Sequence, residues 1–343
     1  MKRSQVDVLI IGAGPAGLAA AIELKKCGIK EVRVVEREKN AGGVPRHSYH
    51  PGYGLRDLKR FLSGPAYAQY YVSQAKKAGV EISTSTTATD WADKQTIKLT
   101  SPNGLEQVGA KAIILATGAR ERGRSARVIA GKRPAGIYTT GSLQQASYLE
   151  DLYIGKAAVI VGAEHVSFSA VMTLKHAGVK TVAMICDKQK HQTVIFVPTI
   201  MKLLYRFRFL SATKIIEIQG DVRVTGVKIE KNGKESIIKA DTIIFTGDWI
   251  PDHELARRAG FAIDESYKSP IINNDGQIPN TSIYTVGNLI LPIKGADKCA
   301  IDARKVARKI AKKIKKEEDI PMPSKEQLEK EVLKLSEKLK AAK

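Results

Sequence analysis

Residues 8–24 read Val-Leu-Ile-Ile-Gly-Ala-Gly-Pro-Ala-Gly-Leu-Ala-Ala-Ala-Ile-Glu-Leu, and a second apolar stretch, Val32-Arg-Val-Val-Glu36, follows soon after. This order predicts a strand, a Gly-x-Gly-x-x-Gly turn, a helix and a second strand that ends in an acid. Gly12 permits the tight turn, and Gly14 allows the backbone to approach a pyrophosphate. Gly17 allows the helix to pack closely on the sheet, so the stretch predicts a βαβ unit with a ligand-facing turn.

The same stretch supplies two more features of a phosphate-binding unit. Pro15 and Ala16 fall where the helix begins, and a helix N-terminus presents unpaired N–H groups and a partial positive charge. Glu36 stands where such units place an acid that accepts hydrogen bonds from a ribose diol. A glycine turn without a ligand is the alternative, but strand, helix and acid together favour an adenine dinucleotide.

A weak internal repeat indicates two such units in tandem. The first unit is followed by a helical stretch at about 64–78, then by β-rich segments and a buried strand. The second half repeats this order, from a strand at 157–161 to a buried strand at 242–247. We therefore predict an α/β fold of two Rossmann-like, three-layer ββα domains, with the second inserted in the first and a basic helical tail. The β-rich segments and buried strand of the first half are 80–90, 94–100, 103–109 and 112–118; the expected domains are 1–120 with 248–316, then 121–247, then the tail 317–343.

Length and cysteine content are those expected of a cytoplasmic enzyme, whereas the strongly positive net charge is unusual for a flavin or nicotinamide enzyme. The 343 residues suffice for two cores, and the net charge is +21. Glycines and a proline interrupt the apolar N-terminal run, which we assign to strand and helix rather than to a secretion signal. Three widely spaced cysteines are typical of a reduced protein. Basic and aromatic residues do not interleave, so no nucleic-acid partner is expected.

Short motifs give the chain a resemblance to a known family. Beside the first glycine turn, two strands end in Ala116-Thr-Gly118 and Phe245-Thr-Gly247, and Thr285-Val-Gly-Asn-Leu289 comes late in the chain. Over roughly residues 5–314, the chain resembles the two-domain flavoproteins of the pyridine-nucleotide–disulfide oxidoreductase superfamily, with a layout like that of thioredoxin reductase. Four further stretches are similar to the flavin subunit of hydrogen cyanide synthase, opine oxidase and related amine or amino-acid dehydrogenases; they are 42–47, 50–54, 119–122 and 287–299.

The resemblance implies bound FAD and assigns roles to individual residues. The glycines of the first turn would hold the pyrophosphate, and Glu36 would hold the adenosine ribose. Asn288, where the superfamily usually has aspartate, would accept a hydrogen bond from the ribityl chain. Asp297 and Lys298 would begin a helix whose N-terminus faces the flavin, although a plain helix N-cap is the alternative for Asp297. The full set expected for FAD is Gly12, Gly14, Pro15, Ala16, Gly17, Glu36, Gly43, Thr117, Gly118, Gly287, Asn288, Asp297 and Lys298.

Two departures from the family pattern limit the expected chemistry. The sequence has no Cys-x-x-Cys pair, so disulfide reduction is not expected. In the second glycine turn, Glu164 and Ser167 replace the second and third glycines, and a carboxylate repels a pyrophosphate. The second domain therefore binds NAD(P) in a shifted pose, binds another nucleotide or is empty. Its expected site residues are Gly162, Glu164, Asp187 and Gly247.

Two further questions stay open at the level of the sequence. Asp187 would suit a ribose diol, whereas Lys188 and Lys190 would suit a 2′-phosphate. His47 and His50 lie in a loop that passes near the flavin in relatives, where a histidine moves a proton near neutral pH. Ordinary packing in a surface loop is the alternative for both histidines. The histidines show no metal-ligand spacing, so no metal is expected.

These features predict an FAD-dependent oxidoreductase that passes electrons between its flavin and a nicotinamide or a partner subunit. Its donors would be CH–NH or CH–NH2 groups of an amine or amino acid, or NAD(P)H, and it would be one subunit of a dehydrogenase complex or a homodimer. The alternative is a nucleotide-binding assembly subunit whose flavin is structural or absent. The amphipathic stretch 304–316 and a second helix with Leu328, Val332, Leu335 and Leu339 would dock on the protein itself, a twin or a partner, with a membrane surface as the alternative.

Overall fold

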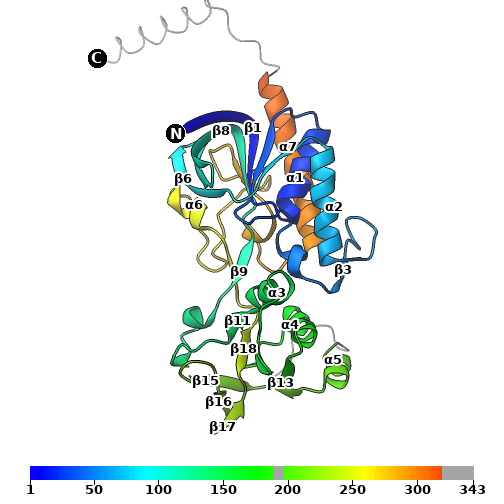
Figure 1. Cartoon of the computed structure of the whole chain (residues 1–343). Helices are drawn as coiled ribbons and strands as arrows, with labels where there is room; N and C mark the ends of the chain where they lie inside the picture. Colours follow the sequence, from blue (N-terminus) through cyan, green and yellow to red (C-terminus); the bar gives the residue numbers. More distant parts are fainter. Residues whose placement is uncertain (189–196, 319–343) are drawn as a thin grey trace, which may run out of the picture.

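The computed structural model describes residues 1–188 and 197–318, which fold into two lobes (Figure 1). The first lobe contains both ends of the described chain, and the second lobe contains its middle. The elements of the first lobe are β1 (Lys2–Ile11), α1 (Pro15–Lys26), β2 (Val32–Val35), η1 (Val44–His47), β3 (Pro51–Tyr53), β4 (Leu62–Ser63), α2 (Gly64–Lys77), β5 (Glu81–Ser83), β6 (Thr87–Asp93), β7 (Thr96–Ser101), β8 (Gly104–Leu115), α6 (Glu254–Arg258), β20 (Ile283–Thr285), η3 (Gly287–Leu289) and α7 (Ala296–Glu318). Those of the second lobe are η2 (Arg124–Arg127), β10 (Ala130–Gly131), β11 (Ile137–Thr139), α3 (Thr140–Tyr148), β12 (Ala157–Val161), α4 (His165–His176), β13 (Lys180–Ile185), α5 (Val197–Tyr205), β14 (Arg208–Leu210), β15 (Thr213–Gln219), β16 (Gly226–Lys231), β17 (Lys234–Lys239) and β18 (Thr242–Phe245).

The sheet of the first lobe explains the uninterrupted apolar runs of the sequence. Its strands lie in the order β5-β2-β1-β8-β7-β6, and β20 also pairs with β8. The central strand β1 runs parallel to both β2 and β8. Val8 and Ile10 pack against the helices α1, α2 and α7, whereas Leu9 packs in the opposite core with residues of β7. Because both faces of the sheet are covered here, the last four residues of β1, Val8–Ile11, are all apolar and buried.

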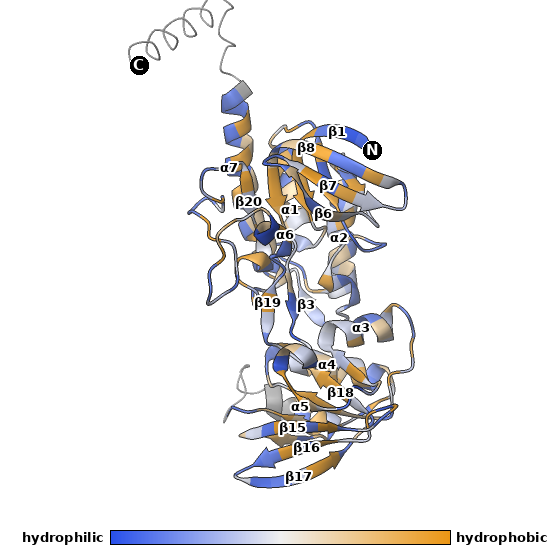
Figure 2. Cartoon of the chain, turned by 90° about the vertical axis from the view of Figure 1, so that its left-hand side faces the viewer, coloured by the Kyte–Doolittle hydropathy of each residue, from blue (hydrophilic) through white to orange (hydrophobic). Residues whose placement is uncertain are grey.

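The second lobe also has a parallel sheet with helices on one face, and a separate second sheet covers its other face. Its parallel sheet has the order β11-β18-β12-β13-β14, and a second sheet has the order β10-β15-β16-β17. Ala158 and Ile160 of β12 pack with residues of α3 and α4, whereas Val159 packs with residues of β15, β16 and β17. Figure 2 shows the hydrophobic residues gathered in strands such as β8 and β18. The fold is α/β with two Rossmann-type domains, as predicted.

Two short strands join the lobes. β9 (Ala119–Glu121) and β19 (Trp249–Pro251) pair antiparallel, with Trp249 opposite Glu121. β9 lies between the lobes in Figure 1. These strands adjoin the domain limits at residues 120 and 248 that we infer from the sequence, and those limits stay a prediction.

One expected boundary differs from the structure. The segments 103–109 and 112–118, expected as separate strands, contribute to one strand, β8, of 12 residues. The first half of β8 pairs with β7, and its end pairs with β20. A single strand therefore serves both the antiparallel insertion and the parallel sheet.

The amphipathic stretch 304–316 lies in α7, which packs along α1. Ile310 and Ile314 are buried in the same core as Leu24. This stretch therefore docks on its own domain. The second predicted helix, with Leu328 and Leu339, lies outside the described residues. Within residues 1–188 and 197–318, no helix is long and apolar enough to cross a membrane.

Candidate functional site

A cleft of about 2140 Å³ connects the first glycine turn with the second lobe. Its walls include the ends of β1, β2 and β8, the loop around η1, the start of α7 and the turn before α4. These strand ends are carboxyl ends, where open α/β sheets bind their ligands. The cleft therefore lies where the sequence places the dinucleotide.

The first glycine turn leaves the N-terminus of α1 open to this cleft. The Gly12 N–H donates to Val35 O over 2.8 Å, which ties the turn to the end of β2. A Cβ on Gly17 would lie 2.0 Å from Gly12 O, so only glycine allows α1 this close to the turn. A Cβ on Gly14 would approach nothing closer than Gly43 Cα, at 4.0 Å. A row of helix N–H groups with no side chain in front of it fits a pyrophosphate.

Backbone N–H groups hold the Glu36 carboxylate in place in the lining of the cleft. Its side chain is buried, with the residue 8% exposed. Oε2 accepts from the Ala13 N–H over 2.9 Å, and Oε1 accepts from the Glu38 N–H over 3.0 Å. Each carboxylate oxygen retains a lone pair for a further hydrogen bond. Glu36 therefore fits the ribose of a dinucleotide bound at the turn.

Arg46 is a site residue that the sequence reasoning missed. Its side chain lines the cleft, and its Nη2 lies 3.7 Å from Glu38 Oε2. Its Nε is buried and has no hydrogen-bond partner among the described residues. A buried, unpartnered guanidinium N–H fits an anionic ligand in the cleft. The only signal in the sequence is its place next to His47 in the Gly-Gly-Val-Pro-Arg-His motif.

Asp297 connects the start of α7 to a distant loop instead of capping its own helix. It lies in the first turn of α7, so the N-cap alternative is wrong. Its two carboxylate oxygens accept from the Gly54 N–H over 2.9 Å and from the Arg56 N–H over 2.8 Å. Lys298 is partly exposed and pairs with Asp302 over 2.9 Å. Asp297 thus positions the loop that borders the end of the cleft at α7.

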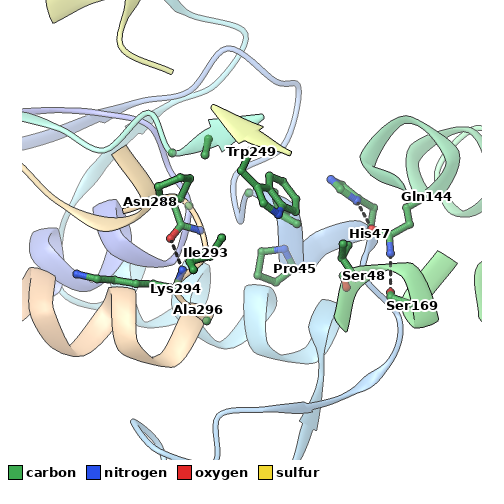
Figure 3. A pocket seen from close by; sticks show the side chains of 18 of the residues that line it. Pro45, His47, Ser48, Gln144, Ser169, Trp249, Asn288, Ile293, Lys294 and Ala296 are labelled. Carbon is green, nitrogen blue, oxygen red and sulfur yellow. Dashed lines mark hydrogen bonds between the residues drawn. The ribbon is translucent and has the colours of Figure 1, made fainter. Parts of the chain in front are cut away.

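The expected role of Asn288 needs a correction. Its Oδ1 accepts from the Lys294 N–H over 3.1 Å and from the Cys299 thiol over 3.4 Å. Figure 3 shows the bond to Lys294. The amide oxygen is therefore already bonded within the chain, and the group that Asn288 offers to a ligand is its NH2 donor. Asn288 lines the cleft as expected, but as a donor rather than an acceptor.

The other residues expected to hold FAD surround the same part of the cleft. The Thr117 hydroxyl donates to Asp252 O over 2.7 Å, so it fixes the chain where it leaves β8. Gly287 lies behind the cleft, against Ala16 at the start of α1. The lining also includes Gly12, Gly14, Pro15, Ala16, Gly43, Gly118, Asp297 and Lys298.

His47 joins the two lobes through a chain of polar side chains (Figure 3). It is 4% exposed, and its Nδ1 lies 3.2 Å from Gln144 Oε1. The Gln144 amide nitrogen donates to Ser169 Oγ over 2.9 Å, so its oxygen faces His47 as an acceptor. His47 Nδ1 therefore carries the proton, which leaves Nε2 as the acceptor, 3.5 Å from Gln145 Nε2. Burial lowers the pKa of His47, so the ring is neutral near pH 7.

His50 has a local role. Its Nδ1 lies 2.9 Å from Pro51 O, and its ring stacks on Tyr53 with centroids 5.1 Å apart. Burial lowers the pKa of this histidine too. Trp249, which the sequence reasoning also missed, lines the cleft from β19 and lies between Asn288 and His47 in Figure 3.

The structure predicts a pH effect that depends on His47. A lowered pKa in the folded state means that the unfolded chain binds more protons below about pH 6.5, so stability falls as the pH falls through this window. We expect His47→Gln to reduce this fall but not to abolish it, because His50 remains. The measurement is the melting temperature between about pH 7.5 and about pH 5. His176→Gln, at an exposed position of α4, is the control, and an unchanged slope in His47→Gln would contradict the assignment.

The residues of the second glycine turn lie at the far end of the cleft. Gly162 follows β12, and Glu164 is the N-cap residue of α4. Asp187 follows β13, and its Oδ1 lies 3.9 Å from Cys186 Sγ. Gly247, after β18, lies beside the Glu164 carboxylate. Lys188 lines the cleft next to Asp187, whereas Lys190 lies outside the described residues.

The cysteines are separate thiols. Cys27, Cys186 and Cys299 are all free, and burial raises the pKa of Cys299 to about 11. A protonated thiol is a poor nucleophile and a poor redox partner. Across the described part of the chain, no group of three or more His, Cys, Asp or Glu residues could hold a metal ion.

Comparison with known proteins supports the resemblance inferred from the motifs. An opine oxidase subunit of Rhizobium meliloti is 25% identical over 316 residues, which cover 83% of this chain and 59% of that protein. Thioredoxin reductase of Mycolicibacterium smegmatis is 24% identical over 303 residues, covering 84% of this chain and 91% of that protein. The chain therefore spans between 59% and 64% of the length of the first two opine oxidase relatives.

Solved structures agree on the fold. Thioredoxin reductase of T. acidophilum superimposes with a TM-score of 0.76 at 19% identity, covering 90% of this chain and 98% of that chain. L-proline dehydrogenase of P. horikoshii gives a TM-score of 0.68 at 18% identity, covering 91% and 56%. The family model for pyridine nucleotide-disulphide oxidoreductases, which are flavoenzymes that bind FAD and NAD(P), matches residues 6–311. The chain belongs to the pyridine nucleotide-disulphide oxidoreductase family.

Proposed function

We propose that this chain is an FAD-dependent oxidoreductase that passes electrons between its flavin and an external donor or acceptor. One observation carries this proposal. The cleft continues without interruption from the open N-terminus of α1 and Glu36, past Asn288 and Asp297, to the polar cluster around His47. One end of the cleft suits the dinucleotide, and the other end leaves space for a reaction partner.

The chain's own residues would bind and orient the cofactor. The N–H groups at the start of α1 would hold the pyrophosphate, and Glu36 would hold the adenosine ribose. The unpartnered Nε of Arg46 would donate to an anionic group. The N-terminus of α7 would stabilise negative charge at the other end, since a helix N-terminus carries a partial positive charge. When bound, FAD supplies two-electron redox chemistry that no side chain provides.

The polar cluster around His47 would position the reaction partner. His47 Nε2 is an acceptor on a buried, neutral ring that lines the cleft, so it can receive a proton from a reaction partner bound there. The donor we propose is an amine or amino acid with a CH–NH or CH–NH2 group, with NAD(P)H as the second candidate. The likeness to the opine oxidase relatives supports the first of these.

We also propose that the chain works with a partner subunit. The name of its opine oxidase relatives describes one subunit of an assembly, and the chain spans only part of their length. The net charge of +21 would accelerate docking of an acidic partner in a salt-dependent manner. The free cysteines fit the cytoplasmic location expected from the sequence.

Spectroscopy of the purified protein tests the proposal. We expect a yellow protein whose flavin absorbance is bleached without air by an amine or amino acid in the presence of the partner, and slowly or not at all by the chain alone. Assays with amino acids, NADH and a dye acceptor, on the protein co-purified from its native source, identify the donor. A flavin that no donor reduces in the complex would favour a structural role, and full turnover by the isolated chain would contradict the partner.

A further inference from the structure

The two glycine turns of this chain have the same backbone but different residues at the position that faces a ligand. The Gly12 N–H donates to Val35 O over 2.8 Å, and the Gly162 N–H donates to Ile185 O over 2.9 Å. In each turn, the N-cap residue of the following helix comes two positions later, and it is Gly14 for α1 and Glu164 for α4. The first turn therefore serves as an internal reference for the second.

In the second turn, the Glu164 side chain folds back over the turn. Its Oε2 accepts from the Ser167 hydroxyl over 3.0 Å and from the Thr246 hydroxyl over 3.0 Å. Ser167 Oγ in turn accepts from the Glu164 N–H over 3.1 Å. These bonds hold the carboxylate in one place, so it does not extend into the solvent.

The two glycines next to this carboxylate show which space it fills. A Cβ on Gly162 would lie 2.6 Å from Glu164 Oε2, and a Cβ on Gly247 would lie 2.7 Å from Glu164 Cδ. The carboxylate is therefore in contact with the backbone that follows β12 and β18. At the equivalent position of the first turn, the space in front of Gly14 is open, with Gly43 Cα at 4.0 Å from a Cβ placed there.

A second carboxylate engages the neighbouring backbone donors. Glu121 Oε1 accepts from the Gly247 N–H over 3.2 Å, and Glu121 Oε2 accepts from the Gly141 N–H in the first turn of α3 over 2.9 Å. Arg127 donates to Thr246 O over 2.8 Å, and its guanidinium attracts both Glu121 and Glu164. The Gly247 N–H, the Gly141 N–H and the Arg127 guanidinium, which lie beside the second turn, are therefore already partnered within the chain.

We propose that the second lobe is a self-closed nucleotide site, in which the Glu164 carboxylate occupies the place of a ligand pyrophosphate. NAD(P), which the fold family implies, does not fit at the N-terminus of α4, because a second anion would meet a carboxylate fixed in the same space. This proposal rests on the proposed function, because it assumes that the first lobe binds FAD. The redox partner of the flavin is then not a nicotinamide bound at this turn, but another donor or a partner subunit.

Calorimetric titration of the purified flavoprotein with NADH, NADPH and ADP-ribose tests the proposal. For the unaltered chain we expect binding weaker than about 1 mM for all three. Glu164→Gly, which copies the first turn, is expected to tighten binding by about tenfold or more. Glu164→Gln is the matched control: it keeps the volume of the side chain and is expected to remain closed.

Each other outcome would count against the closed site. Micromolar binding of NADH or NADPH by the unaltered chain would overturn it, and so would Glu164→Gln binding as well as Glu164→Gly. If Glu164→Gly lowers the melting temperature, Glu164→Ser replaces it, because serine is a good N-cap residue and leaves the same space open. Absorbance of the bound flavin is recorded separately. A missing flavin would refute the proposed function, while the comparison of the variants would still decide the state of the second site.

Discussion

Substitution of Gly14 by leucine is expected to abolish FAD retention and to leave both lobes folded. Gly14 has φ −78° and ψ −177°, an extended conformation that any residue adopts, so the backbone does not require glycine. A Cβ there would make only an ordinary contact, at 4.0 Å from Gly43 Cα. The rest of a leucine side chain would lie in front of the N–H groups of α1, where we expect the pyrophosphate to bind. The substitution therefore affects the ligand rather than the fold.

Gly123 offers a matched control for this substitution. It is the N-cap residue of η2, with φ −74° and ψ −179°, almost the same backbone conformation as Gly14. It contributes nothing to the lining of the FAD cleft, so Gly123→Leu should retain FAD. The measurement is the ratio of flavin to protein after gel filtration, together with thermal unfolding. Full flavin content in Gly14→Leu would refute the assignment of the first turn.

The two Rossmann-type units could be predicted because their signals are local. Runs such as Val8–Ile11 and Ala157–Val161 are apolar at every position, which is typical of strands that are covered on both faces. The glycine turns then mark where each helix begins. The length of β8 could not be predicted in this way. Its two halves have different partners, β7 and β20, and pairing across the sheet decides where a strand ends.

The contacts that shape the cleft escaped prediction because they join residues far apart in the sequence. His47 and Gln144 are 97 positions apart, and Asp297 and Gly54 are 243 positions apart. A sequence shows that Asn288 and Asp297 carry polar groups, but not which lone pairs other donors already occupy. The roles of these two residues changed for that reason. For Glu164 the sequence indicated repulsion of a phosphate, and only the structure shows that the carboxylate lies in the turn itself.

The largest effect on stability is expected at Asp57, a carboxylate inside the first lobe. Its side chain is 0% exposed. Its Oδ2 accepts from the Tyr67 hydroxyl over 2.8 Å and from the Tyr71 hydroxyl over 2.6 Å, and Arg304 of α7 lies 3.7 Å away. Burial raises the pKa of both tyrosines well above the usual range, so they remain donors. One carboxylate thus joins α2, α7 and the loop between β3 and β4.

Asp57→Ala is therefore expected to lower the free energy of unfolding by about 3 kcal/mol. The substitution leaves two phenol hydroxyls without their shared acceptor and Arg304 without the carboxylate that it pairs with. Tyr71→Phe removes one donor to the carboxylate and the hydroxyl that accepts from Arg304. It should cost about 1 kcal/mol, less than Asp57→Ala, because Tyr67 still donates to the carboxylate and Arg304 keeps its ion pair with it. Glu265→Ala, at an exposed acid, should have almost no effect. Denaturant unfolding of the three variants gives these differences directly.

The same substitution should also weaken FAD binding, although Asp57 does not line the cleft. The loop that Asp57 anchors supplies the Gly54 and Arg56 N–H groups that bond to Asp297 at the start of α7. A looser loop leaves the Asp297 carboxylate with fewer donors beside the cofactor and raises the free energy of the bound state. Faster flavin dissociation is thus expected in Asp57→Ala than in Tyr71→Phe, at a temperature where both variants are folded. Equal dissociation rates would show that the loop and the cleft are independent.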